Sequence, residues 1–393
     1  MPDASSTHAP AGDTAPAPAP APAPSGRLLG IDALRGLAVF LMMEQHMSIW
    51  LYRAPRGRTI LSDPVLMAFQ AAGGVAAPLF ITLAGLGTSL LIGKQLRTGR
   101  RTGLGVDLLL ARRGVALMLF GLFLNLITPS WFSPGSWFVL HLMGFAMALA
   151  PVWRRIPSAV LLTLALAVLG GTVALQNWLD TPFLLGNGRM RNTGLPGGAL
   201  RLAFAEGQFP IFPWLSMFLS GMVVGRWIAA GQRGRILRLA GVTLTLGASL
   251  AACYVLTRSG VLPKFLLQDP WVRLFRIRGS FYPANPPIIL LLHTIVLLLL
   301  ALVLRLGEFW PRSTNAWMVA LGRTSLTLLI LHVYVFRELS RLPFLNLWQN
   351  VPSVAGTLGI IFTWTLLTAW LARFWERVGY RFGAEWLLRK AGG

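Results

Sequence analysis

Long apolar runs recur along almost the whole chain, and short stretches rich in Arg, Gly and Pro separate them. A helix that crosses a bilayer needs about 20 mainly apolar residues. The pattern therefore predicts an all-α integral membrane protein, a bundle of about ten transmembrane helices with short cytoplasmic loops. The expected spans are residues 33–50, 65–92, 114–128, 137–152, 158–179, 209–230, 236–256, 286–304, 316–336 and 351–374.

Composition excludes a soluble enzyme. Of the 393 residues, 55% are hydrophobic and only 12% are charged, about half the usual charged share of a soluble domain. The single cysteine, Cys253, rules out an intramolecular disulfide, a thiolate zinc site and a cluster, so we expect no metal site. The net charge of +22 does not indicate nucleic-acid binding, because the basic residues are scattered through the loops.

The two ends of the chain differ from its middle. Residues 1–26 form an Ala/Pro-rich stretch that predicts a disordered cytoplasmic tail, since it lacks the basic and apolar regions of a signal peptide. Residues 27–376 form the transmembrane domain, and residues 377–393 a basic cytoplasmic C-terminal tail. With the N-terminus inside, 22 of the 35 Lys and Arg residues face the cytoplasm. Because cytoplasmic loops are enriched in Lys and Arg, this count predicts that both termini are cytoplasmic.

Four of the five histidines lie within expected spans, and all four fall in the outer half of the membrane on this topology. They are His46, His141, His293 and His332. Ionisable groups inside a span often line a cavity or a functional path. Each histidine could instead make a hydrogen bond between packed helices. Both interpretations stay open for each of the four.

The first span carries a polar stripe. At 100° per residue, Asp32, Arg35 and His46 share one face of the helix, and about 20 Å separates Asp32 from His46. A lipid-facing stripe would not carry such groups, so we expect this face to line protein or a tunnel. Glu44 points about 160° away from His46, so it needs its own partner or is protonated.

A basic cluster precedes and begins the third span, where Arg112 and Arg113 follow four other cationic residues in the preceding loop. Paired guanidinium groups bind phosphate oxygens well, so the cluster could hold a nucleotide phosphate. It could equally be ordinary anchoring at the cytoplasmic surface. Two long outer loops, residues 180–208 and 257–285, are candidates for a functional role, since long loops often carry one.

These motifs resemble those of the bacterial membrane proteins related to heparan-α-glucosaminide N-acetyltransferase, within the multi-span sugar acyltransferases. The likeness runs from Arg27 to Phe336. It is carried by RLLGIDALRGLAVFLMMEQH, PLFITLAGLGTSLL, ARRG, WFVLHLMGFAMAL, FPIFPWLSMFLSGMVVGR and LGRTSLTLLILHVYVF, in that order.

The resemblance implies a membrane-bound acyltransferase, with residues 27–376 as its acyltransferase domain. It would move an acyl group, usually acetyl, from cytoplasmic acyl-CoA to an amine or hydroxyl of an extracytoplasmic sugar or glycoconjugate. Acetyl-CoA is then a donor substrate, with no permanently bound cofactor. A bacterial inner-membrane location follows, and a homodimer is compatible with the sequence.

Site residues carry over by their motif positions. His46 matches the candidate base, while Asp32 and Arg35 match the opening motif, and His332 and His141 complete the catalytic set. The expected donor-binding residues are Arg112, Arg113, Trp214 and Ser325. One departure concerns residues 61–74, which contain no His where the lysosomal enzymes have one, and His46 stands at their Asn. This departure puts glucosamine as acceptor in doubt.

Two other functions remain compatible with the residues. The first is a transporter or flippase for an amphiphilic or glycolipid substrate, with the histidines on a proton path. The absence of a clear internal repeat in the sequence speaks against it. The second is a metal- or haem-binding protein, which the lack of His pairs four residues apart makes less attractive.

Overall fold

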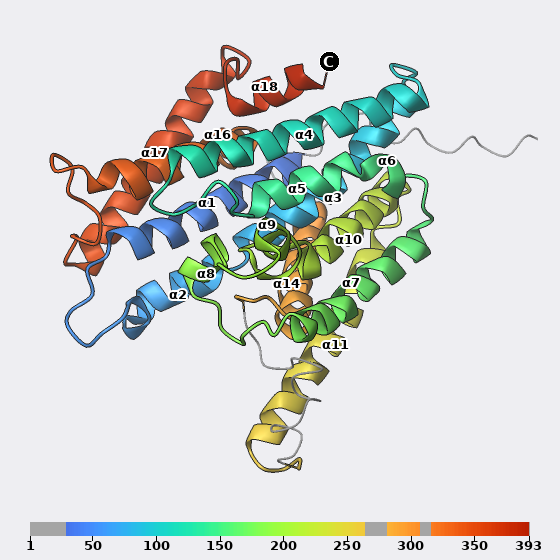
Figure 1. Cartoon of the computed structure of the whole chain (residues 1–393). Coiled ribbons are helices and arrows are strands. Elements are labelled where there is room, and N and C mark those ends of the chain that lie inside the picture. Colours follow the sequence, from blue (N-terminus) through green and yellow to red (C-terminus); the bar gives the residue numbers. More distant parts are fainter. Residues whose placement is uncertain (1–28, 264–280, 307–315, 393) are drawn as a thin grey trace, which may run out of the picture.

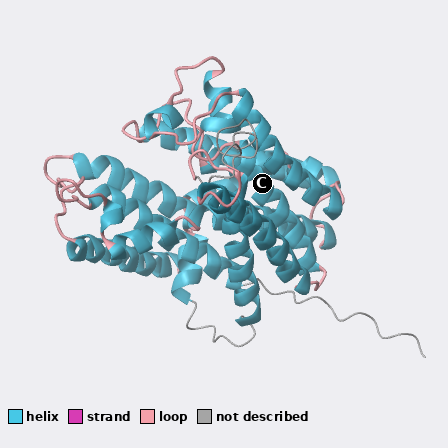
Figure 2. Ribbon diagram, turned by 90° about the horizontal axis from the view of Figure 1, so that it is seen from below, coloured by secondary structure: helices cyan, strands magenta, loops and turns pink. Residues whose placement is uncertain are grey.

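The computed structural model describes residues 29–263, 281–306 and 316–392, and its regular structure there is helical (Figure 2). Within these ranges, extended pairing is limited to two isolated bridges, Tyr52 with Val351 and Phe281 with Ala284. The expectation of a disordered tail at residues 1–26 falls outside the described residues. The all-helical class predicted from the apolar runs is confirmed.

The described helices follow one another along the chain (Figure 1). They are α1 (Leu29–Leu51), α2 (Pro64–Gly73), α3 (Ala76–Arg97), α4 (Gly103–Ile127), α5 (Val139–Ala148), α6 (Ala150–Trp153), α7 (Ser158–Trp178), α8 (Asn187–Arg191), α9 (Gly198–Arg201), α10 (Ile211–Ala229), α11 (Gly234–Arg258), α14 (Pro286–Leu306), α15 (Ala316–Arg323), α16 (Ser325–Val333), α17 (Val354–Glu376) and α18 (Ala384–Ala391). Two single π-helical turns, η2 (Leu202–Glu206) and η3 (Tyr334–Glu338), and two 3₁₀ turns, η1 (Ile60–Ser62) and η4 (Leu339–Arg341), complete the described structure.

Among the described residues, seven helical segments are long and apolar enough to cross a membrane, or eight if the bent pair α15–α16 is one span. The prediction of about ten spans is therefore not confirmed. Helix α1 is 23 residues long but contains Asp32, Arg35 and Glu44, and α5 has only ten residues. Helix α4 begins at Gly103, well before the predicted start at residue 114.

The bundle has a buried centre and a periphery that exposes apolar side chains. Helices α3, α10 and α14 are mostly buried, while α11 and α17 are mostly exposed. The outer face of α17 presents Phe362, Leu366 and Trp370. Exposure of such a large apolar surface to water is unfavourable, so the peripheral helices face lipid. Helix α11 projects away from the bundle at the bottom of Figure 1.

Two glycines bring α1 and α15 into backbone contact. A Cβ atom placed at Gly36 would lie 2.0 Å from the Met318 carbonyl oxygen, and one at Gly322 would lie 1.9 Å from the Asp32 carbonyl oxygen. Small residues permit such close approach between helices in a membrane. The chain then bends by 76° between α15 and α16. This bend lets the two halves of one segment meet α1 at different places, which positions the polar groups described next.

Candidate active site

His46 and His332 meet near the end of α1. His46 Nδ1 lies 3.0 Å from His332 Nε2, although 286 positions separate the two residues in the chain. His332 Nδ1 lies 2.9 Å from the Leu328 carbonyl oxygen, one turn earlier on α16. His332 is fully buried, whereas His46 is half-buried. His46 is thus the less buried member of the pair.

These contacts fix where the protons lie when both rings are neutral. A carbonyl oxygen only accepts, so His332 Nδ1 carries the hydrogen and donates it to Leu328. His332 Nε2 then has a lone pair and accepts the Nδ1 hydrogen of His46. The Nε2 atom of His46 is left with a free lone pair, which is the form that a general base requires.

Tryptophan rings enclose His46. The Trp50 ring stacks on it with centroids 4.9 Å apart, and the Trp131 ring meets it edge-on at 5.2 Å. Aromatic faces attract cations, so these rings would stabilise the imidazolium that forms when His46 takes up a proton. Trp50 comes from α1 itself, and Trp131 comes from the loop between α4 and α5.

Arg337 ties three segments together beside this enclosure. Its guanidinium donates to the hydroxyl and the carbonyl oxygen of Ser130, at 3.1 and 2.9 Å. It also lies 4.4 Å from the ring centroid of Trp348, which stacks on Trp50. Arg337 belongs to the π-helical turn η3 that follows His332, and π-turns occur frequently at functional sites.

The other two membrane histidines lie elsewhere. The His141 ring packs over Gly121 of α4, and its Nδ1 accepts from the Phe138 backbone at 3.5 Å. His293 Nε2 lies 2.7 Å from the Ser220 hydroxyl, deep between α14 and α10. Neither ring contacts the His46–His332 pair. Of the four histidines predicted from the sequence, the structure brings two together.

Asp32 and Arg35 lie together at the opposite end of α1. Arg35 donates to Asp32 at 3.0 Å, and Arg323 at the end of α15 is 3.8 Å from the same carboxylate. Arg323 also pairs with Glu376 of α17 at 2.6 Å. The predicted stripe therefore faces protein, as expected. Its ion pairs join α1, α15 and α17, and none of these contacts involves His46.

The two arginines on α4 that were predicted to bind the donor differ in their exposure. Arg112 is exposed, whereas Arg113 is half-buried beside the end of α18, and its Nε has no hydrogen-bond partner among the described residues. The positive charges of Arg101 and Arg389 act on Arg113. Several cations thus converge where α4 meets α18, which is the arrangement that phosphate groups favour.

Helix α18 also reaches the start of α16. Glu385 accepts from the backbone N–H groups of Leu326 and Thr327 and from the Thr327 hydroxyl, the last at 2.6 Å. Burial raises the pKa of Glu385, and these hydrogen bonds oppose that shift. Ser325 begins α16 next to this contact. The predicted basic tail, residues 377–393, therefore contains a helix that packs on α4 and α16.

Trp214 and Glu44, which the sequence also singled out, contact neither the His46–His332 pair nor the cations where α4 meets α18. Trp214 is fully buried on α10 among Phe209 and Phe281, and its Nε1 has no hydrogen-bond partner among the described residues. Glu44 is also buried, and neither of its carboxyl oxygens has a partner there. The sequence left open whether Glu44 has a partner or is protonated. The described residues provide no hydrogen-bond partner for it.

The first long loop, residues 180–208, is organised around Glu206 of η2. This buried carboxylate accepts from Thr181 and Arg189, each at 2.9 Å, and pairs with Arg201 at 2.8 Å. Burial would raise the pKa of Glu206, but the hydrogen bonds from Arg201, Arg189 and Thr181 outweigh it and hold the pKa below its usual value. Arg191 of the same loop donates to the Pro129 carbonyl oxygen, close to Trp131. The loop therefore supports the segment that encloses His46.

A comparison with protein-family models shows which family the chain belongs to. The family model "Heparan-alpha-glucosaminide N-acetyltransferase, catalytic" matches residues 27–258, more than half of the chain. The chain belongs to this family. A search of curated proteins found no match. Family membership makes the protein an acetyl-CoA-dependent transmembrane acetyltransferase with an amine acceptor.

The matched region of this acetyltransferase contains His46 and ends at Arg258, before His332. The His46–His332 contact therefore joins the matched region to the final third of the chain. Sequence reasoning missed Trp50, Trp131, Arg337 and Trp348. Trp50 could have been found, because it lies one helical turn after His46. The other three come from distant segments, and no local pattern relates them to His46.

Proposed function

We propose that the protein transfers an acetyl group from cytoplasmic acetyl-CoA to an amine of a sugar on the far side of the membrane, with His46 as the general base. The observation that supports this most directly is the hydrogen-bonded series from Leu328 through His332 to His46, which leaves the His46 Nε2 lone pair free. Such a base contributes about 10² to 10⁴-fold in rate.

The proposed reaction is a direct acyl transfer from the thioester to the acceptor. The acceptor nitrogen attacks the thioester carbonyl, and His46 Nε2 takes its proton. The new bond to carbon forms as the carbon–sulfur bond breaks, and His46 returns the proton to the departing thiolate. His332 acts as a positioning residue, since it holds His46 through Nδ1. The same lone pair could attack the thioester directly, and trapping an acetylated His46 in a rapid quench distinguishes the two routes.

Arg113 and the exposed Arg112 would hold the donor's phosphates at the cytoplasmic surface. Arg113 lies fourteen residues before the end of α4, so about 21 Å of helix separates it from the end that leads to Trp131. This separation suits a long donor whose charged and reactive ends lie at different depths. It also agrees with the proposed topology, in which both termini are cytoplasmic in a bacterial inner membrane.

Release of coenzyme A from acetyl-CoA by the purified protein, with and without amino sugars, tests this proposal. We expect release that depends on the acceptor and yields one acetylated product per thiol. Arg113→Ala should raise the KM for acetyl-CoA by about tenfold or more, because charged hydrogen bonds contribute about 1.5–3 kcal/mol, and leave the acceptor KM nearly unchanged. Proton-coupled movement of the sugar without thiol release would instead support a transporter.

A further inference from the structure

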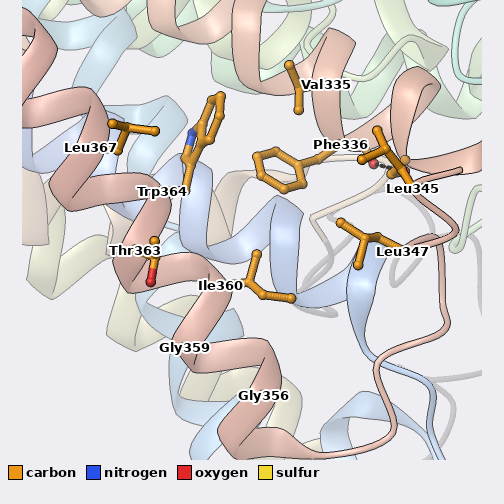
Figure 3. A pocket seen from close by; sticks show the side chains of 11 residues that line it. Val335, Phe336, Leu345, Leu347, Gly356, Gly359, Ile360, Thr363, Trp364 and Leu367 are labelled. Carbon is orange, nitrogen blue, oxygen red and sulfur yellow. Dashed lines mark hydrogen bonds between the residues drawn. The ribbon is translucent and has the colours of Figure 1, made fainter.

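An apolar cavity of about 450 Å³ lies beside the candidate site, between α17 and the segment from η3 to residue 347. Figure 3 shows the lining side chains, among them Phe336 and Trp364, whose rings are in contact, together with Ile360 and Leu347. The two rings meet edge-on with centroids 4.9 Å apart. The lining is almost wholly apolar, so the cavity suits hydrocarbon.

The cavity opens on the lipid-facing surface of the bundle. Leu345 and Leu367 line it and are 39% and 45% exposed, and neighbouring residues of α17 expose further large apolar side chains. Gly359 widens it, because a Cβ atom placed there would meet nothing within 4 Å. A hydrocarbon chain can therefore enter from the membrane without displacing protein.

The cavity lies near the His46 enclosure, because residues adjacent to its lining belong to that enclosure on two segments. Leu347 lines the cavity, and Trp348 beside it stacks on Trp50, which stacks on His46. Phe336 lines the cavity one turn after His332, and Arg337 beside it lies over Trp348. The segments that line the cavity thus also carry residues that surround the proposed base.

Two cationic side chains, Arg337 and Arg341, lie over Trp348. The Arg341 guanidinium lies 3.7 Å from the Trp348 ring centroid, and the Arg337 guanidinium lies 4.4 Å from the same centroid. Arg341 is exposed. Two neighbouring guanidinium groups attract a phosphate. The two guanidinium groups therefore lie near Trp348, which is adjacent in sequence to the cavity residue Leu347 and stacks on Trp50 of the His46 enclosure.

We infer that the acceptor is lipid-linked: a sugar joined through a phosphate to a hydrocarbon chain, with the chain in this cavity, the phosphate at Arg337 and Arg341, and the reacting sugar at His46. This inference rests on the proposed function and names its acceptor class. Docking of the chain would gain little hydrophobic free energy, since the chain leaves one apolar environment for another. Its effect would be to orient the sugar toward His46.

Two acceptors with the same head test the inference in nanodiscs: glucosamine 1-phosphate and its dodecyl phosphodiester, each with acetyl-CoA. We expect the dodecyl compound to be the better substrate. Gly359→Leu, which fills the cavity, should lower kcat/KM for the dodecyl compound at least about tenfold, a loss of about 1.4 kcal/mol, and leave that for glucosamine 1-phosphate unchanged. Gly170→Leu is the matched control, because Gly170 is also an exposed helical glycine with nothing within 4 Å.

A dodecyl acceptor carrying a photoreactive group at its chain end provides a second readout on the unaltered protein. Labelling concentrated on residues 356–367 would support the inference. Labelling spread over all lipid-facing helices, or equal loss for both acceptors in Gly359→Leu, would overturn it. Efficient acetylation of both acceptors without chain-length preference would overturn it while leaving the proposed function intact. Acetylation of neither would contradict the proposed function itself.

Discussion

The pairs His46–His332 and His293–Ser220 are both polar contacts between apolar helices. They differ in what surrounds them. His332 uses both ring nitrogens and leaves one lone pair on the half-buried His46, among tryptophans. His293 uses one nitrogen on a buried hydroxyl, and its Nδ1 meets no partner among the described residues. A histidine in a membrane becomes useful for catalysis when a second group fixes its tautomer and a substrate can reach it.

The largest effect that separates the two pairs is expected for His46→Ala. Turnover should fall about 10² to 10⁴-fold, because the base is lost, while acetyl-CoA affinity stays near that of the unaltered protein. The buried His332 Nε2 loses its partner, so the free energy of unfolding should also fall by about 1–3 kcal/mol. Turnover, donor binding and thermal unfolding measured on one preparation check this. Retention of more than about a tenth of the activity, well short of the loss expected for a base, would remove His46 from the mechanism.

Replacement of His332 should follow in size. In His332→Leu the His46 Nδ1 hydrogen loses its acceptor, so the imidazole is free to turn and change tautomer. We expect a fall in kcat of about 10 to 100-fold, the usual cost of removing a group that orients a functional histidine. His332→Gln keeps an acceptor near the same place and should restore part of the rate. Equal activity of the two variants would assign His332 a packing role only.

A smaller effect is expected from the loop that supports Trp131. The lowered pKa of Glu206 means that its ion pairs stabilise the loop fully above its usual value of 4.5, and that this stability is lost as pH falls through the lowered pKa. The protection of residues 198–206 against hydrogen exchange, relative to the intrinsic rate at each pH, should therefore fall in acid. In Glu206→Gln the exchange should be fast at neutral pH as well, with exchange in α11 unchanged. Slow exchange in this variant would contradict the role given to Glu206.

The smallest effect on turnover should come from His293→Ala. The Ser220 hydroxyl loses its partner in a buried place, so the free energy of unfolding should fall by about 1–3 kcal/mol, with little change in rate. Thermal unfolding beside turnover distinguishes this from a catalytic loss. A fall in turnover as large as that of His46→Ala would place His293 in the reaction and erase the distinction between the pairs.

Much of this picture could be predicted from the sequence, and the remainder could not for identifiable reasons. Apolar runs of bilayer length indicate the helices, and the family motifs indicate His46 and His332. The number of spans could not be settled, because α1 carries three charged residues and α5 is too short. Periodicity places Asp32, Arg35 and His46 on one face, but it cannot show that Arg323 and Glu376 complete one end of that face.

The tryptophan enclosure lay beyond sequence reasoning for a different reason. Trp131 and Trp348 come from loops whose conformation depends on tertiary contacts, such as that of Arg337 with Ser130. Propensity and spacing describe only neighbours within a few turns. The cavity beside α17 depends in the same way on how residues 345–347 fold back against that helix.

The most direct test of the central claim is a double-mutant cycle on His46 and His332, with turnover as the readout. If His332 acts only by positioning His46, the double variant His46→Ala with His332→Leu should be no slower than His46→Ala alone, because groups that act as a unit are strongly non-additive. If the two losses instead multiply, each histidine contributes independently, and the proposed relay from Leu328 through His332 to His46 is wrong.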